Sequence, residues 1–136
     1  MRQKSISLLD ANIFLRYLLW DDPPKASRCQ ALFQRLERDE ETARVLDLTL
    51  AEVVWTLQKD FGVDRRKIRD LLRTIPEFKG LKVPDKTIVL KALDVFAERA
   101  VDFPDDYIAK AARPVELQVY SYDLDLTPLK VNRREP

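Results

Sequence analysis

Two hydrophobic patterns meet in the stretch Ser5-Ile-Ser-Leu-Leu-Asp10-Ala-Asn12-Ile-Phe-Leu-Arg-Tyr-Leu-Leu19. Its first part, the apolar run from Ile6 to Leu9, is typical of a buried strand. Asp10 interrupts that run, and apolar residues at helical spacing follow, namely Ile13, Phe14, Tyr17 and Leu18. The stretch therefore predicts a strand followed by a helix, with a carboxylate at the point where the strand ends.

Asp10 has two interpretations at this position. In parallel α/β sheets, ligands bind outside the carboxyl ends of the strands, which is where Asp10 is expected to lie. Asp is also a preferred helix N-cap, and Asn12 would help to hold the turn. This stretch alone favours the cap, so the rest of the chain has to decide between a cap and a ligand.

Length, composition and charge indicate one globular domain over residues 1–136. Apolar residues make up 46% of the chain and charged residues 35%, which fits a folded protein of the ordinary kind. The net charge is +1, so a surface that binds nucleic acid has to be a local one. No apolar run approaches the roughly 18 residues of a membrane span, and residues 1–9 do not fit a signal peptide. The single cysteine, Cys29, excludes an internal disulfide and suits a reducing cytoplasm.

Two absences restrict the chemistry. The chain has no histidine, which excludes a histidine base, a Ser-His triad and a zinc site built on imidazole. Its two glycines, Gly62 and Gly80, are too few for a phosphate-binding glycine loop. Any catalysis therefore depends on carboxylates.

Further apolar patterns predict strands that alternate with helices, an α/β domain with a mainly parallel sheet. A stripe of four residues predicts a helix that Thr49 opens: Leu50, Val53, Val54 and Leu57. Gly62 ends it and Asp64 caps the next helix, which gives a helical hairpin arm. Three other helices are expected. One lies at about 25–38, and one begins at 85 or 86, with Ile88, Ala92, Val95 and Phe96 facing inward. The last lies at 107–112, with Ile108 and Ala111 buried. The other expected strands are 43–48, 81–83, 117–120 and an edge strand at 129–132, with 133–136 frayed.

Acidic residues recur where strands end and helices begin: Asp10, Glu52, Asp105 with Asp106, and Asp123. Each has a local explanation, because Thr49 and Glu52 form a capping-box pattern, acids at a helix start complement its dipole, and Asp123 suits a turn. Together, however, converging carboxylates repel one another unless a cation compensates them. Mg²⁺ and Mn²⁺ prefer such oxygen ligands. The set therefore favours a divalent metal site at one edge of the sheet.

At these residues the sequence resembles a PIN domain, and within that family the VapC-type toxins of toxin–antitoxin pairs. Four segments carry the resemblance, in the family's order and with roughly its spacing: Leu9-Asp10-Ala-Asn12-Ile-Phe-Leu-Arg-Tyr-Leu18, Thr49-Leu-Ala-Glu52-Val-Val-Trp-Thr-Leu57, Val101-Asp102-Phe-Pro-Asp105-Asp106-Tyr-Ile108-Ala109 and Tyr120-Ser121-Tyr-Asp123-Leu-Asp125. No one segment is specific, but the ordered set spans nearly the whole chain.

The resemblance implies a three-layer α/β/α fold and a metal-dependent endoribonuclease. It implies that four acids hold Mg²⁺, or Mn²⁺ in its place, and that two polar residues support them: Asp10, Glu52, Asp105 and Asp123, with Asn12 and Ser121. Proteins of this kind are cytoplasmic, commonly dimerise and cleave RNA, often tRNA or rRNA, through a metal-activated water. A cognate antitoxin typically plugs their active site.

Asp106 departs from the family pattern, which has a small residue after the third acid. Either Asp105 or Asp106 fits the ligand position, and the offset to Ile108-Ala109 favours Asp105. Because neighbouring side chains on a helix differ by about 100°, only one of the two is expected to face the metal. The other is expected to be solvated or to contact substrate.

The sequence leaves the role of Arg16 and the function of the protein open between alternatives. Arg16, on the first helix, would contact RNA phosphate or the antitoxin, although a solvated helix face is the commoner role of such a residue. The function also has alternatives to a toxin ribonuclease. One is a catalytically silent PIN-like module that binds RNA or a protein, and another is a metal-dependent phosphoryl-transfer enzyme that acts on small phosphates.

Overall fold

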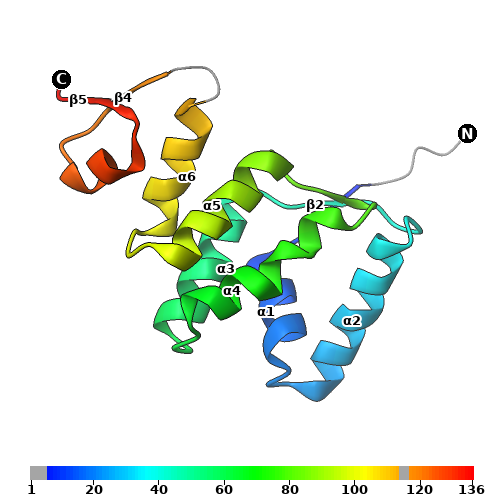
Figure 1. Cartoon of the computed structure of the whole chain (residues 1–136). Helices are drawn as coiled ribbons and strands as arrows, with labels where there is room; N and C mark the ends of the chain where they lie inside the picture. The colour runs from blue at the N-terminus through cyan, green and yellow to red at the C-terminus, as the bar shows by residue number, and fades with distance from the viewer. Residues whose placement is uncertain (1–5, 114–116) are drawn as a thin grey trace, which may run out of the picture. The chain divides into compact units, whose positions relative to one another are not determined.

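The computed structural model describes residues 6–113 and 117–136 (Figure 1). Residues 1–5 lie outside the described residues. They include Ser5 and most of residues 1–9, the segment that is expected not to be a signal peptide. The described chain divides into two compact units, the first ending at Pro84 and the second beginning at Asp85. Each unit is described in turn.

Parallel strands form the sheet of the first unit. Its strands are β1 (Ser7–Leu8), β2 (Ala43–Arg44) and β3 (Leu81–Lys82), in the order β1-β2-β3. Ala43 pairs with Ser7 on one side and with Leu81 on the other, and both pairings are parallel. The fold is α/β with parallel strands and helices between them, as the sequence predicts.

The first two strands differ from the expectation in burial and in length. Ile6 and Leu8 are 57% and 62% exposed, and only Leu9 of the apolar run is buried. Among the described residues, β1 is an edge strand of this sheet, with β2 as its neighbour. The expected buried strand is therefore wrong for most of its residues. The expected strand at 43–48 is too long, because a helix begins at Asp47.

Helices α1 (Ala11–Leu19) and α2 (Pro23–Glu37) pack together in the first unit. The ring centroids of Phe14 and Phe33 are 5.4 Å apart, and both rings are buried. α2 begins two residues before the expected position because Pro23 and Pro24 occupy its first turn, where proline needs no N–H partner. Apolar contacts between these helices thus make one part of the core.

Helices α3 (Asp47–Lys59) and α4 (Arg65–Arg73) form the predicted helical hairpin. All four residues of the expected α3 stripe are buried, from Leu50 to Leu57. Gly62 adopts a φ of 61° in the turn, and the Asp64 carboxylate accepts a hydrogen bond from the N–H of Arg66. A short 3-10 helix, η1 (Ile75–Glu77), then leads to β3.

The second unit contains α5 (Lys86–Glu98), α6 (Phe103–Ala112), β4 (Gln118–Tyr120), the 3-10 helix η3 (Leu124–Leu129) and β5 (Asn132–Arg134). β4 and β5 pair in parallel. Ala109, Leu126 and Leu129 form a buried cluster between α6 and η3. The tail differs from the expectation, because the final strand lies at 132–134 and two of the residues expected to fray, Arg133 and Arg134, pair with β4.

Helix α6 begins at Phe103, four residues before its expected start. Phe103 is buried and packs edge-on against Phe96 of α5, with ring centroids 6.1 Å apart. This contact sets the helix face that turns inward, so Ala109 and Ala112 are buried while Ile108 is 47% exposed. The expectation that Ile108 is buried is therefore wrong, and Ala111 is only half-buried.

The buried face of α5 is also rotated from the expected one. Ala92 and Phe96 are buried as expected, but Ile88 and Val95 are only half-buried, and Val89, Leu93 and Ala97 complete the inner face. Across the described residues, we find no helix with the length and apolar character needed to cross a membrane.

Candidate metal centre

Asp10 lies between β1 and α1 in the first unit. Its backbone is extended, and its Oδ1 accepts a hydrogen bond of 2.9 Å from the N–H of Ala11. The side-chain amide of Asn12 donates to its Oδ2 at 3.3 Å. The cap interpretation is thus confirmed, and the exposed carboxylate still has lone pairs for a cation.

Glu52 lies in α3 with an exposed side chain. The capping-box explanation of this residue is wrong, because the helix begins at Asp47 and Thr49 is already inside its first turn. Asp47 occupies that turn instead, and its Oδ1 accepts a hydrogen bond of 3.0 Å from the N–H of Leu48. The carboxylate of Glu52 is therefore not used for capping.

Asp105 and Asp123 are neighbours in the second unit. Asp105 is half-buried in the first turn of α6. Its pKa is raised mainly by burial, and the charges of Asp123, Asp102 and Asp125 raise it further. A bound cation would relieve this repulsion.

Ser121 holds the backbone beside Asp123. The hydroxyl of Ser121 accepts a hydrogen bond of 3.0 Å from the N–H of Asp123. The carboxylate of Asp123 in turn accepts one of 2.9 Å from the N–H of Asp125, which caps η3. Ser121 therefore orients the turn that carries Asp123.

Asp106 is fully buried, unlike Asp105. The Lys110 ammonium lies 3.2 Å from its Oδ1, one helical turn away, although neither oxygen has a well-aligned hydrogen-bond donor among the described residues. Burial raises the pKa of Asp106 to about 6, while the charge of Lys110 opposes that rise. The expectation that the second acid is solvated or contacts substrate is wrong for Asp106.

The predicted site residues divide between the two units. The first contains Asp10, Asn12 and Glu52, and the second contains Asp105, Ser121 and Asp123. Among the described residues, neither unit by itself brings three or more Asp, Glu or Cys side chains to metal-binding positions. The structure brings two pairs of these residues together, Asp10 with Asn12 and Asp105 with Asp123.

Arg16 lines a pocket of about 340 Å³ in the first unit. Its guanidinium forms an ion pair of 3.2 Å with Asp21, and both side chains are partly exposed. The pocket is lined by Asn12, Ile13, Arg16, Lys25, Arg28 and Cys29. Because Asn12 also bonds to Asp10, this cationic pocket adjoins the first predicted metal ligand.

A comparison with protein families supplies the decisive observation. Residues 7–130 match the PIN domain. The chain belongs to the PIN domain family. The matched range includes every acid of the predicted ligand set, from Asp10 to Asp123.

Members of the PIN domain family are generally nucleases that use divalent metal ions, which points to a nucleic acid as the substrate. A search of curated proteins found no match to this chain. The PIN domain match therefore supports the class of chemistry, while the residues of the chain have to support anything finer.

Proposed function

We propose that this PIN domain is a Mg²⁺-dependent endoribonuclease and the toxin of a type II toxin–antitoxin pair. The observation that carries the proposal is the pairing of Asp105 with Asp123. Their negative charges repel each other, and a bound cation would relieve that repulsion.

The proposed ligand set is Asp10, Glu52, Asp105 and Asp123. Carboxylate oxygens suit Mg²⁺, and Mn²⁺ is a reasonable substitute. When bound, such an ion lowers the pKa of a water molecule and neutralises charge on a phosphodiester. Asp106 is not included in the set, because its buried carboxylate is paired with Lys110.

The surrounding residues have supporting roles in this proposal. Asn12 orients the carboxylate of Asp10 through its side-chain amide, and Ser121 orients the turn of Asp123 through its hydroxyl. Arg16, in the pocket beside Asn12, is placed to bind a phosphate of the RNA or an acidic group of the antitoxin. Its exposed ion pair with Asp21 is weak enough to be exchanged for either partner.

The finer parts of the proposal rest on the resemblance of the four acidic segments to VapC-type toxins. RNA, with tRNA or rRNA as the first candidates, is the substrate, and a cognate antitoxin is the partner that blocks the site. The protein acts in the cytoplasm as a homodimer.

The test is cleavage of purified tRNA and rRNA by the full chain, freed of any co-purified antitoxin. Reactions contain Mg²⁺, Mn²⁺ or EDTA, and the matched variant is Asp10→Asn, which keeps the cap acceptor but loses the charge. We expect defined products with either metal, none with EDTA, and a loss of at least about a hundredfold in the variant. Expression of the wild type, but not of Asp10→Asn, is expected to stop bacterial growth.

Cleavage that persists in EDTA or in the Asp10→Asn variant contradicts the proposed mechanism. Tight RNA binding without metal affinity or cleavage would instead identify a catalytically silent module. A covalent phosphate trapped on Asp10 would indicate phosphoryl transfer on small substrates.

A further inference from the structure

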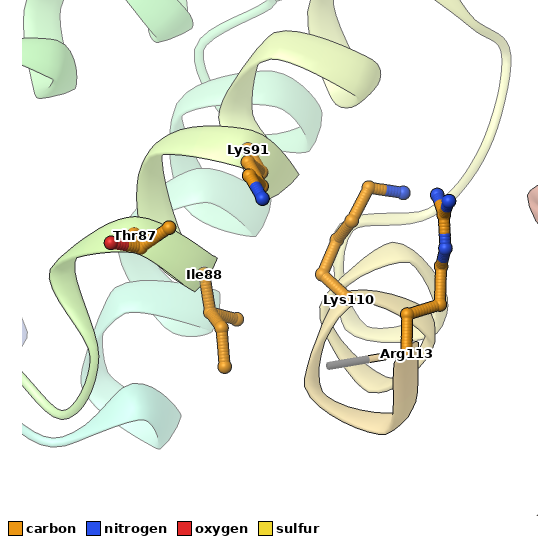
Figure 2. Close-up of a pocket in the computed structure, with 5 residues that line it drawn as sticks. All are labelled: Thr87, Ile88, Lys91, Lys110 and Arg113. Carbon is orange, nitrogen blue, oxygen red and sulfur yellow. The ribbon is translucent and has the colours of Figure 1, made fainter. Parts of the chain in front are cut away.

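A second cationic pocket lies in the second unit, between α5 and the end of α6 (Figure 2). Its volume is about 380 Å³. α5 supplies Thr87, Ile88 and Lys91, α6 supplies Lys110, and Arg113 follows the last residue of α6. Figure 2 shows the nitrogen atoms of Lys110 and Arg113 close to each other, with that of Lys91 across from them on α5.

The charge of this pocket is strongly positive. Among the residues that the structure describes, its lining has three cations and no carboxylate. Asp106 neutralises Lys110 from within the core, where it is fully buried and therefore not available to a ligand. Among the described residues, Lys91 and Arg113 have no ion-pair partner. An anion in this pocket would thus face Lys91 and Arg113, beside Lys110, whose charge the buried Asp106 compensates.

Arg113 also lines a neighbouring pocket of about 440 Å³ together with Lys130. Because the two pockets share Arg113, we treat the four cations that line them as one row: Lys91, Lys110, Arg113 and Lys130. A row of this kind suits an anion with repeating charges better than an isolated one.

We infer that this row, which we call the α5–α6 cation track, binds the sugar–phosphate backbone of single-stranded RNA outside the bond that is cleaved. The choice of RNA rests on the proposed function. The composition of the pocket between α5 and the end of α6 supports it, because Lys and Arg bind phosphate oxygens. An acidic peptide is less suitable, since Ile88 is the one apolar side chain among the described residues of that lining and peptides need apolar anchors.

The test measures RNA binding separately from cleavage. A fluorescent oligoribonucleotide of mixed sequence is titrated with the full chain carrying Asp10→Asn, in EDTA, and the anisotropy is followed at several salt concentrations. The track variant adds Lys91→Gln and Arg113→Gln. The control adds Arg38→Gln and Lys59→Gln, two exposed cations of the first unit, and so removes the same charge.

The track variant is expected to bind about tenfold more weakly or worse. Its slope of log affinity against log salt should fall by about 1.4, because each lost phosphate contact on a single strand contributes about 0.7. The control should change neither quantity appreciably. Thermal unfolding of both variants verifies that they remain folded.

Three results would overturn the inference: an unchanged salt slope in the track variant, an equal loss in the control, or displacement of the RNA by a polyglutamate of matched charge at equal concentration. The outcome is separable from that of the nuclease proposal. If the protein never cleaves RNA but its binding depends on the track residues, the track is supported and the nuclease proposal is contradicted. If the wild type cleaves RNA but the track variant binds as tightly as the control, the nuclease proposal is supported and the track is contradicted.

Discussion

Asp105 and Asp106 are adjacent in sequence but occupy opposite environments. Asp105 faces other carboxylates at the start of α6, while Asp106 turns into the core beside Lys110. The difference follows from the 100° step between successive helical side chains. At the residue scale, the arrangement gives the two acids different tasks, a proposed metal ligand and an internal ion pair.

The buried carboxylate of Asp106 should make stability depend on pH. Its pKa is raised from 3.8 to about 6 in the folded protein, so between these values the unfolded chain binds fewer protons. Stability is therefore expected to fall as the pH rises through this window, by up to about 3 kcal/mol from this one group. Asp106→Asn should remove that part of the fall, as measured by urea unfolding in EDTA from pH 4 to pH 7.

The control for this measurement is Asp60→Asn, at an exposed carboxylate that follows α3. It is expected to keep the pH dependence of the wild type. If Asp106→Asn keeps it as well, the carboxylate does not titrate as its burial requires.

At the scale of elements, the end of α2 lies against the entry to β3. Gly80 connects them: its N–H donates to the carbonyl of Leu36 at 2.8 Å, and its carbonyl accepts from the N–H of Ala43 at 2.9 Å. A Cβ on this residue would overlap the backbone carbonyl of Glu41 and crowd that of Leu36. The position therefore needs glycine for space rather than for an unusual φ.

Gly80→Ala is expected to destabilise the fold by about 3 kcal/mol, because the backbone atoms that the methyl group meets cannot move away easily. The matched variant is Gly62→Ala, where the added Cβ meets open space but φ is 61°. That change should cost about 1 kcal/mol. Urea unfolding of both variants is the measurement, and a loss at Gly80 no larger than at Gly62 would contradict the crowding.

At the scale of the whole molecule, the PIN domain match runs across both compact units, from residue 7 to residue 130. The proposed ligands are two from each unit, Asp10 and Glu52 from the first and Asp105 and Asp123 from the second. The proposed activity therefore requires both units to contribute to one ligand set.

Binding of Mn²⁺ tests this requirement through the melting temperature. At about 100 times its dissociation constant, the ion should add roughly 2.7 kcal/mol of stability to the wild type. Asp10→Asn, Asp105→Asn and Asp123→Asn should each lose most of that gain, because each removes a charged ligand. Asp106→Asn should retain it.

The four variants are compared by thermal unfolding with Mn²⁺ and with EDTA. Loss of the metal effect in Asp106→Asn, with retention in Asp105→Asn, would exchange the roles of the two acids. Loss confined to the variants of one unit would contradict a ligand set drawn from both.

The sequence by itself determined the features that depend on local pattern. The stripe from Leu50 to Leu57 predicts the buried face of α3, and the glycine and aspartate at 62 and 64 predict the turn into α4. These signals work because helical periodicity and capping act over a few residues. The ordered acids, from Asp10 to Asp123, likewise indicated the family before any contact was known.

Tertiary structure decided where helices begin and which face turns inward. Packing of Phe103 on Phe96 starts α6 early and buries Asp106, while the start of α3 at Asp47 removes the capping box of Thr49 and Glu52. The α5–α6 cation track also depends on tertiary structure. Only the ion pair of Asp106 with Lys110 could have been predicted from the sequence, because the two residues have i, i+4 spacing on one helix. Such features depend on contacts between residues distant along the chain, and those contacts outweigh local preference because they bury more apolar surface.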